Sequence, residues 1–143
     1  MIRIGVTGAA GRMGRTVIET AADREDVTVV FAVDTTDDGT VAEKPIHEPA
    51  DIDALLATHE PDAVIDFTVP GAALEFVESC ADAGVPFVTG TTGFDDDQLE
   101  TLKEASEDAP VLKAANFARG IQALLSTVTA AAEALPSYDV ELT

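Results

Sequence analysis

The sequence predicts a protein of the α/β class whose core is a doubly wound parallel sheet. Short, apolar, β-branched segments alternate with segments of helical periodicity along almost all of the 143 residues. The apolar segments lack the polar–apolar alternation of one-sided strands, and such runs are typical of parallel strands covered on both faces. Right-handed crossovers between these strands produce the doubly wound arrangement.

The same patterns predict the order of the elements. The predicted strands are residues 2–7, 27–33, 62–67, 87–89 and 111–112. The predicted helices are residues 12–23, a short helix marked by Ile52, Leu55 and Leu56, and residues 72–83, 95–107 and 120–134. Residues 35–49 are polar and contain Gly39, Pro45 and Pro49, which predicts a loop. Residues 140–142 predict the opening of a further strand, and no boundary divides the single domain 1–143.

Composition excludes several classes of protein. The chain carries 27 acidic and 8 basic residues, and its net charge of −19 repels nucleic acids and acidic membranes. Apolar residues make up 46% of the chain, too many for a disordered acidic tail. Cys80 is the only cysteine, so no internal disulfide and no metal site is expected. No apolar run approaches the roughly 18 residues of a membrane span, and we expect a soluble, cytoplasmic protein.

The acidic residues are spread over the whole chain, which indicates a solvated surface. Residues 95–97, all aspartates, could bind a cation, but they stand where a helix is predicted to begin and complement its dipole. The pattern suggests a halophilic protein adapted to a salt-rich cytoplasm, where salt screens the surplus charge. We therefore expect the fold to loosen when salt is removed.

A glycine turn joins the first predicted strand to the first predicted helix. Gly8, Gly11 and Gly14 have the spacing G-x-x-G-x-x-G. Such glycines permit a tight turn and let backbone N–H groups approach a pyrophosphate at the helix N-terminus. Turn glycines also occur without a ligand, but the position directly after the first strand favours a dinucleotide site. Arg12 could reach the phosphates, whereas Arg15 is expected to be an exposed helix residue.

Asp34 ends the second predicted strand, 20 residues beyond Gly14. A carboxylate there can accept hydrogen bonds from the hydroxyls of the adenine-side ribose, although a surface aspartate at a strand end is the alternative. No Arg or Lys stands in residues 35–38 to meet a 2′-phosphate, and the carboxylate itself would repel one. The sequence therefore favours NADH over NADPH.

Two more polar segments follow predicted strands, at the edge where doubly wound sheets bind ligands. Residues 90–93 offer threonine hydroxyls and glycine N–H groups, and residues 114–117 offer an amide and an aromatic ring. Asn116 could instead be the N-cap of the last helix, and Phe117 could belong to the core. Together with the glycine turn, these segments predict one cleft running from adenine to nicotinamide.

These motifs resemble the N-terminal, nucleotide-binding part of dihydrodipicolinate reductase, also called 4-hydroxy-tetrahydrodipicolinate reductase. They are residues 11–15 (GRMGR), 66–68 (DFT), 90–94 (GTTGF) and 116–117 (NF), in the family's order and approximate spacing. The resemblance covers essentially the whole chain. It implies a Rossmann-like dinucleotide-binding fold and the reduction of a cyclic dicarboxylate by NADH or NADPH, on the diaminopimelate route to lysine.

The resemblance also implies a set of cofactor-binding residues. Those that match the pyrophosphate turn are Gly8, Ala9, Ala10, Gly11, Arg12 and Met13, and Asp34 matches the acidic ribose ligand. Those that match the two nicotinamide segments are Gly90, Thr91, Thr92, Ala114, Ala115, Asn116 and Phe117. Two positions depart from the family pattern, because Ala118 replaces a common serine and Thr35 replaces a common basic residue. The second departure supports NADH.

In the family, a His-His…Lys segment and a Ser-Gly-Thr loop follow in a second domain that holds the dicarboxylate substrate and forms a homotetramer. His47, His59 and Lys113 match none of these motifs, so no catalytic acid or base is expected here. We therefore expect the chain to supply the cofactor-binding part of the reductase, to lack the second domain and to be inactive alone. The alternatives are a stand-alone NAD-binding or NAD-sensing module, and a different oxidoreductase or CoA-binding domain with similar loops.

Overall fold

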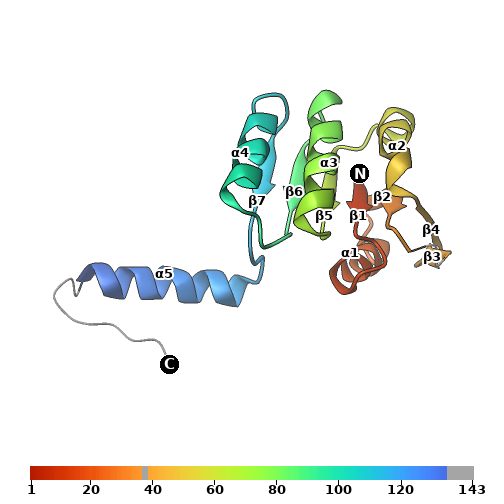
Figure 1. Ribbon diagram of the computed structural model, residues 1–143. Helices are drawn as coiled ribbons and strands as arrows, with labels where there is room; N and C mark the ends of the chain where they lie inside the picture. Colours follow the sequence, from red (N-terminus) through yellow and green to blue (C-terminus); the bar gives the residue numbers. More distant parts are fainter. Residues whose placement is uncertain (37–38, 135–143) are drawn as a thin grey trace.

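The computed structural model describes residues 1–36 and 39–134, which form one sheet flanked by helices (Figure 1). The strands are β1 (Ile2–Thr7), β2 (Val27–Val33), β3 (Thr40–Val41), β4 (Lys44–His47), β5 (Ala63–Asp66), β6 (Phe87–Thr89) and β7 (Val111–Lys113). The helices are α1 (Arg12–Ala22), α2 (Ile52–His59), α3 (Pro70–Asp82), α4 (Asp96–Ala105) and α5 (Arg119–Ala134), with a 3-10 turn, η1 (Pro49–Asp51), before α2.

The order of strands across the sheet is β3-β4-β2-β1-β5-β6-β7. All neighbouring pairs run parallel except β3 and β4, which are antiparallel. The chain therefore starts in the middle with β1, moves outward through β2, and returns past β1 to continue on the other side with β5. This reversal of direction is the switch point of a doubly wound sheet, and it confirms the predicted fold class.

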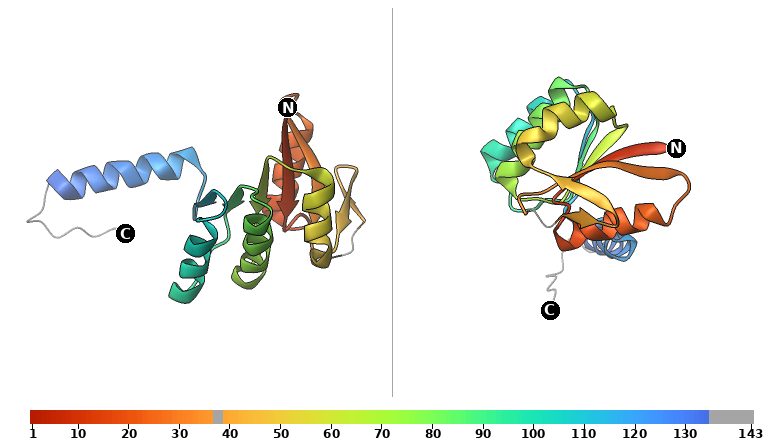
Figure 2. Two further views of the ribbon diagram at one scale, coloured as in Figure 1. Left: turned by 90° about the horizontal axis from the view of Figure 1, so that it is seen from above. Right: turned by 90° about the vertical axis from the view of Figure 1, so that its right-hand side faces the viewer.

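Helices cover both faces of the sheet, with α1 on one face and α2, α3 and α4 on the other (Figure 2). The larger core cluster joins strand residues such as Phe31 and Phe87 to Phe76 of α3 and Leu102 of α4. A smaller cluster on the opposite face packs Ile18 of α1 against β1 and β2. The continuous apolar runs of the central strands are thus explained by burial on both sides.

The prediction of a loop over residues 35–49 is wrong in part, because this segment contains β3 and β4. Ile46 and His47 of β4 pair with the end of β2. A tight turn at Ala42 and Glu43, with φ of 46° and 64°, folds β3 back onto β4. In this segment the local sequence indicates only turn residues and prolines. The strands form because β4 pairs with the edge of β2, which the local sequence does not indicate.

Most helix limits lie within two residues of those predicted. α4 begins after Asp95, which forms a capping box: its carboxylate accepts the Gln98 N–H at 2.9 Å, and the Gln98 side chain accepts the Asp95 N–H at 3.1 Å. This agrees with the reading of residues 95–97 as a helix start. α5 projects away from the rest of the fold and contains no buried residue (Figure 1). The strand predicted at residues 140–142 lies outside the described residues.

Within residues 1–36 and 39–134, no helix combines the length and apolar content needed to cross a membrane.

Candidate functional site

Polar segments follow four neighbouring strands at the carboxyl edge of the sheet. The glycine turn follows β1, Asp34 follows β2, Phe67 and Thr68 follow β5, and residues 90–92 follow β6. Because β2, β1, β5 and β6 are adjacent and parallel, these segments meet at one edge. The structure thus brings together residues that are far apart in the sequence.

The glycine turn is packed so closely that two positions have no room for a side chain. Gly8 has a φ of 71°, and a Cβ atom there would lie 2.4 Å from the Phe67 carbonyl oxygen. A Cβ atom on Gly14 would lie 2.1 Å from the Gly8 carbonyl oxygen. α1 therefore starts directly against the turn, with Gly11 as N-cap and no side chain bonded to its first N–H groups. A helix N-terminus of this kind suits an anion.

Asp34 lies half-buried beside the turn, and both of its carboxylate oxygens accept hydrogen bonds. The Ala10 N–H donates to Oδ2 at 2.9 Å, and the Thr36 hydroxyl donates to Oδ1 at 2.9 Å. Burial acts to raise the pKa of Asp34, but the bonds from Ala10, Thr36 and Thr35 outweigh it and hold the pKa below its ordinary value. Asp34 is therefore a carboxylate at neutral pH.

Two arginines flank the turn in different ways. Arg12, the first residue of α1, is exposed. The expectation that Arg15 is also exposed is wrong, because this residue is half-buried and its Nε donates to the Ala10 carbonyl at 2.8 Å. This hydrogen bond joins α1 to the Ala10 carbonyl, so Arg15 stabilises the conformation of the glycine turn.

Two adjoining cavities open at this edge of the sheet. The first has a volume of about 230 Å³ and is lined by the turn, by Asp34 and by apolar side chains that include Val33, Ala72 and Phe76. The second has a volume of about 390 Å³ and lies between the start of α1, residues 67–70 and residues 90–92. Both are lined by Phe67 and Thr68, so they are neighbouring parts of one cleft.

Between these segments lies the buried carboxylate of Asp66, which belongs to the motif at residues 66–68 and is not one of the predicted site residues. Asp66 has no exposed surface and accepts four hydroxyl hydrogen bonds. Thr7 and Thr68 donate to Oδ1 at 2.8 and 2.6 Å, and Thr89 and Thr91 donate to Oδ2 at 2.7 and 2.8 Å. The available signal in the sequence was a polar residue at or next to the end of three of the predicted strands, namely Thr7, Asp66 and Thr89.

The segment after β6 is held closely against Phe67. A Cβ atom on Gly90 would lie 2.2 Å from the Phe67 ring, so only glycine fits there without a shift of the ring. The Gly90 N–H donates to the Asp66 carbonyl at 2.9 Å. Thr91 is 3% exposed and points into the Asp66 network, whereas Thr92 is exposed beside the second cavity.

Residues 114–117 lie next to the cleft but line neither cavity. The Ala114 N–H donates to the Thr89 carbonyl at 3.1 Å, and the Phe117 ring meets the Phe67 ring edge-on at 6.2 Å between centroids. Phe117 is 46% exposed and is therefore not a core residue. Asn116 is not the N-cap of α5, since its Oδ1 accepts the Ala118 N–H at 2.7 Å in the loop before that helix.

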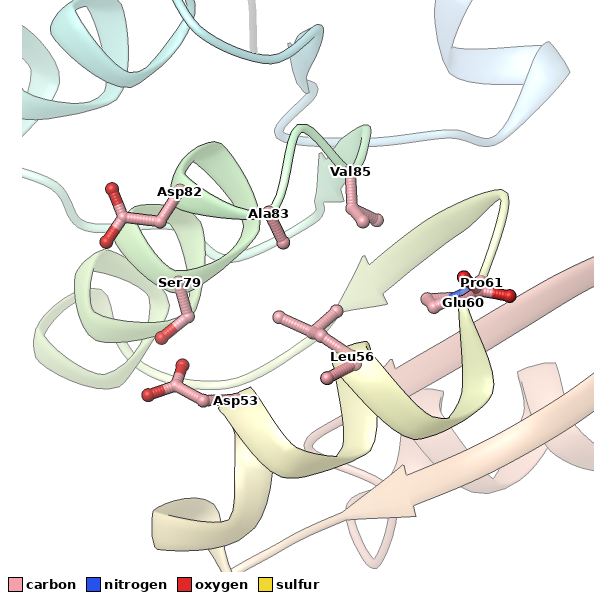
Figure 3. Close-up of a pocket in the computed structure, with 9 residues that line it drawn as sticks. Asp53, Leu56, Glu60, Pro61, Ser79, Asp82, Ala83 and Val85 are labelled. Atoms are coloured by element: carbon pink, nitrogen blue, oxygen red, sulfur yellow. The ribbon is translucent and has the colours of Figure 1, made fainter.

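A larger cavity, of about 510 Å³, lies between α2 and the C-terminal end of α3, away from the glycine turn (Figure 3). Its lining includes Asp53, Leu56, Glu60, Asp82 and Val85, and none of the predicted site residues. In the part of the chain that the structure describes, no three His, Cys, Asp or Glu residues are placed to hold a metal ion.

The remaining candidates for acid–base chemistry lie outside the cleft. The His47 carbonyl accepts the Asp34 N–H at 3.1 Å, and the His59 ring packs 6.0 Å from the Phe31 ring. Lys113 places its ammonium 5.8 Å from the centre of the Phe94 ring. None of the three lines either cavity of the cleft.

A doubly wound sheet with a glycine turn, a helix N-terminus and a strand-end carboxylate at its carboxyl edge defines a Rossmann-type domain. The family model described as "Dihydrodipicolinate reductase, N-terminus" matches residues 2–117. The chain belongs to this family.

Comparison with individual proteins agrees with this assignment. The chain is 48% identical over 142 residues to 4-hydroxy-tetrahydrodipicolinate reductase of Haloarcula marismortui, and 51% identical over 143 residues to that of Natronomonas pharaonis. Each alignment covers 99% of this chain and 56% of the relative, so the chain spans about half the length of the curated relatives it matches. Its fold is similar to the dipicolinate-bound dihydrodipicolinate reductase of Paenisporosarcina sp. TG-14, with a TM-score of 0.78, 29% identity, and coverage of 92% of this chain and 54% of that one.

Proposed function

We propose that this chain is the cofactor-binding part of an NAD(P)H-dependent reductase that converts 4-hydroxy-tetrahydrodipicolinate to tetrahydrodipicolinate. Family membership and the reductase names of the relatives support the reaction. The structural observation that carries the proposal is the convergence of the glycine turn, Asp34 and residues 90–92 on one cleft. The relatives give no support to a stand-alone NAD-sensing module.

The shape and chemistry of the cleft suit a dinucleotide. The first cavity is mostly apolar, with Val33, Ala72 and Phe76 available to pack against an adenine ring. The second cavity combines Arg12 with the threonine-rich segment after β6. Between them lies the start of α1, whose N-cap Gly11 lines both cavities and whose first N–H groups are bonded to no side chain. An extended ligand with an aromatic group at each end and an anionic centre matches this order.

We assign the pyrophosphate to the turn and the nicotinamide to the second cavity. The proposed cofactor-binding residues are Gly8, Ala9, Ala10, Gly11, Arg12, Met13, Asp34, Gly90, Thr91, Thr92, Ala114, Ala115, Asn116 and Phe117. Geometry supports the last four less directly than the others, since they reach the cleft only through the contact of Phe117 with Phe67. The bound cofactor supplies the hydride, and these residues would bind and orient it.

We propose NADH as the preferred cofactor. Asp34 stands in the first cavity as a carboxylate, with Thr35 and Thr36 beside it and no arginine or lysine in the lining of that cavity. A carboxylate accepts hydrogen bonds from ribose hydroxyls and repels a 2′-phosphate. The net charge of −19 adds to this repulsion at low salt.

Substrate binding and proton donation are properties we propose for the whole reductase, since this chain spans 56% of its relatives. Within the described residues, we assign no catalytic acid or base to the cleft. The family resemblance also leads us to propose that the whole protein is a homotetramer. The acidic composition leads us to propose that it works in a salt-rich cytoplasm.

Titration of the chain with NADH and NADPH, followed by calorimetry, tests the cofactor assignment. We expect NADH to bind at least about tenfold more tightly than NADPH, a difference of about 1.4 kcal/mol. Asp34→Asn should reduce the preference for NADH over NADPH, because the substitution removes the charge that repels the 2′-phosphate but keeps an acceptor oxygen. Absence of binding to either cofactor would refute the proposed function, whereas equal affinities would refute only the preference. Hydride transfer to the dicarboxylate substrate is assayed both with the 143-residue chain, which we expect to be inactive, and with a reductase of the relatives' full length as positive control.

A further inference from the structure

Asp66 is the most deeply buried polar group of the cleft, and the proposed function gives it no contact with the cofactor. Its position follows from the sheet: Thr7, Asp66 and Thr89 are direct partners in the parallel register of β1, β5 and β6. In-register residues of neighbouring strands point to the same face, so the three side chains meet below the carboxyl edge. All three have no exposed surface.

The hydrogen bonds around Asp66 have a fixed direction. A carboxylate only accepts hydrogen bonds, so each of the four surrounding hydroxyls acts as the donor in its bond to Asp66. Thr89 Oγ1 donates to Asp66 and at the same time accepts the Thr91 N–H at 3.0 Å. No buried side-chain N or O atom in the described residues lacks a partner. The carboxylate thus orients the buried hydroxyls of Thr7, Thr89 and Thr91 toward itself.

Three hydrogen bonds join the segment that follows β6 to Asp66 and Thr89. The Thr91 hydroxyl donates to Asp66, the Thr91 N–H donates to Thr89, and the Gly90 N–H donates to the Asp66 carbonyl. The segment borders the second cavity on one side and this buried network on the other. Its place in the cleft thus depends on a carboxylate that no ligand in the cleft can touch.

We propose that Asp66, acting through Thr89 and Thr91, is a positioning residue that sets the affinity of the nicotinamide end of the cleft. This inference rests on the proposed function, since it assumes that residues 90–92 receive the nicotinamide. The Asp66 carboxylate accepts the Thr89 hydroxyl proton, which leaves the Thr89 oxygen free to accept the Thr91 N–H. These bonds hold residues 90–92 in one conformation before the ligand binds. Preorganisation of this kind strengthens binding by reducing the ordering cost.

Two Thr→Val variants, in which a methyl group replaces a hydroxyl of similar size, distinguish the positioning role of Asp66 from a general effect on stability. Thr89→Val removes the hydroxyl that joins Asp66 to Thr91. Thr7→Val removes an equally buried hydroxyl from the same carboxylate, on the side away from the segment. Thr89→Ser restores the hydroxyl. For each chain, the dissociation constants of NADH and of ADP-ribose, which lacks the nicotinamide, are measured by calorimetry together with the melting temperature.

We expect Thr89→Val to weaken the binding of NADH by about tenfold and the binding of ADP-ribose by less than about twofold, because only the segment that receives the nicotinamide loses its preorganisation. Thr7→Val should lower the melting temperature but keep the NADH to ADP-ribose ratio of the wild type, and Thr89→Ser should return that ratio toward it. Equal weakening of both ligands, an unchanged ratio in Thr89→Val, or the same ratio change in Thr7→Val would overturn the positioning role. These outcomes differ from failure of the proposed function, in which the wild-type chain itself would bind neither ligand.

Discussion

The Oδ2 atom of Asp34 accepts the backbone N–H of Ala10 at 2.9 Å, joining the end of β2 to the glycine turn across 24 positions of sequence. The carboxylate proposed to bind the ribose therefore also holds the turn proposed to bind the pyrophosphate. Each carboxylate oxygen has two lone pairs, so Oδ2 keeps one for a ligand hydroxyl. Replacing Asp34 must consequently affect the fold as well as the affinity.

Asp34→Ala is expected to lower the free energy of unfolding by about 1–2 kcal/mol, because the Ala10 N–H and the Thr36 hydroxyl lose their acceptor. Asp34→Asn should lose less than about 1 kcal/mol, since its amide oxygen can still accept the Ala10 N–H. Urea denaturation at neutral pH measures both values. Equal losses in the two variants would show that the acceptor oxygen does not stabilise the turn.

The stability contributed by Asp34 should depend on pH in a defined direction. Although burial acts to raise the pKa of Asp34, its hydrogen bonds lower it below the ordinary value for an aspartate. A group with a lowered folded-state pKa stabilises the protein above its unfolded pKa and loses that contribution as the pH falls through the folded pKa. The stability difference between wild type and Asp34→Asn should stay constant from pH 7 to about 5 and shrink below about pH 4. A difference that grows on acidification would contradict the direction of the shift.

Gly14→Ala should prevent the turn from closing, because the new Cβ would lie 2.1 Å from the Gly8 carbonyl oxygen and 2.8 Å from the Ala9 Cα. We expect a loss of about 2 kcal/mol or more of stability and loss of NADH binding. Gly71→Ala is the matched control, since this glycine lies in the first turn of α3 with nothing within 4 Å of the added atom. The control should be neutral or slightly stabilising in thermal denaturation. Destabilisation of similar size in both variants would point to helix propensity rather than to the contact with Gly8.

Salt should stabilise the fold, because the net charge is −19 and few carboxylates are paired. Within the residues that the structure describes, the ion pairs are Arg24–Asp26 and Lys103–Glu100, both at the exposed surface. Screening of the remaining repulsion should raise the melting temperature by about 5 °C or more between 0.1 and 2 M KCl. Calorimetry across this range checks the expectation, with an equal osmolarity of sucrose as control for general preferential exclusion. A melting temperature that does not change would remove the argument for a salt-adapted surface.

Cys80 should be inert in the folded chain. It has no exposed surface, and burial, assisted by the charges of Asp66 and Asp53, raises the pKa of its thiol to about 12. At pH 8 the reactive thiolate is then about one part in ten thousand. We expect its reaction with Ellman's reagent to be at least about 100-fold slower in the native chain than in denaturing urea. Comparable rates would mean that α3 opens readily under native conditions.

Local pattern was sufficient for the main architecture. The apolar runs of the central strands, the helical spacing of the segments between them and the glycine turn are properties of neighbouring residues, and the structure confirms them as β1, α1, β2, β5, α3, β6 and α4. The candidate site could be located for the same reason, since residues that directly follow parallel strands must come to one edge of the sheet.

Only the tertiary structure decided which polar groups meet. β3 and β4 form because β2 offers an open edge, and Arg15 is held because the Ala10 carbonyl faces it. Asp66 accepts hydrogen bonds from the hydroxyls of Thr7 and Thr91, which lie 59 and 25 positions away in the sequence. Hydrogen bonds between residues so far apart in the sequence depend on the register between strands, which no local pattern specifies. The sequence thus determined the strands, helices and turn, while the packing of the sheet determined the partners that give the cleft its shape.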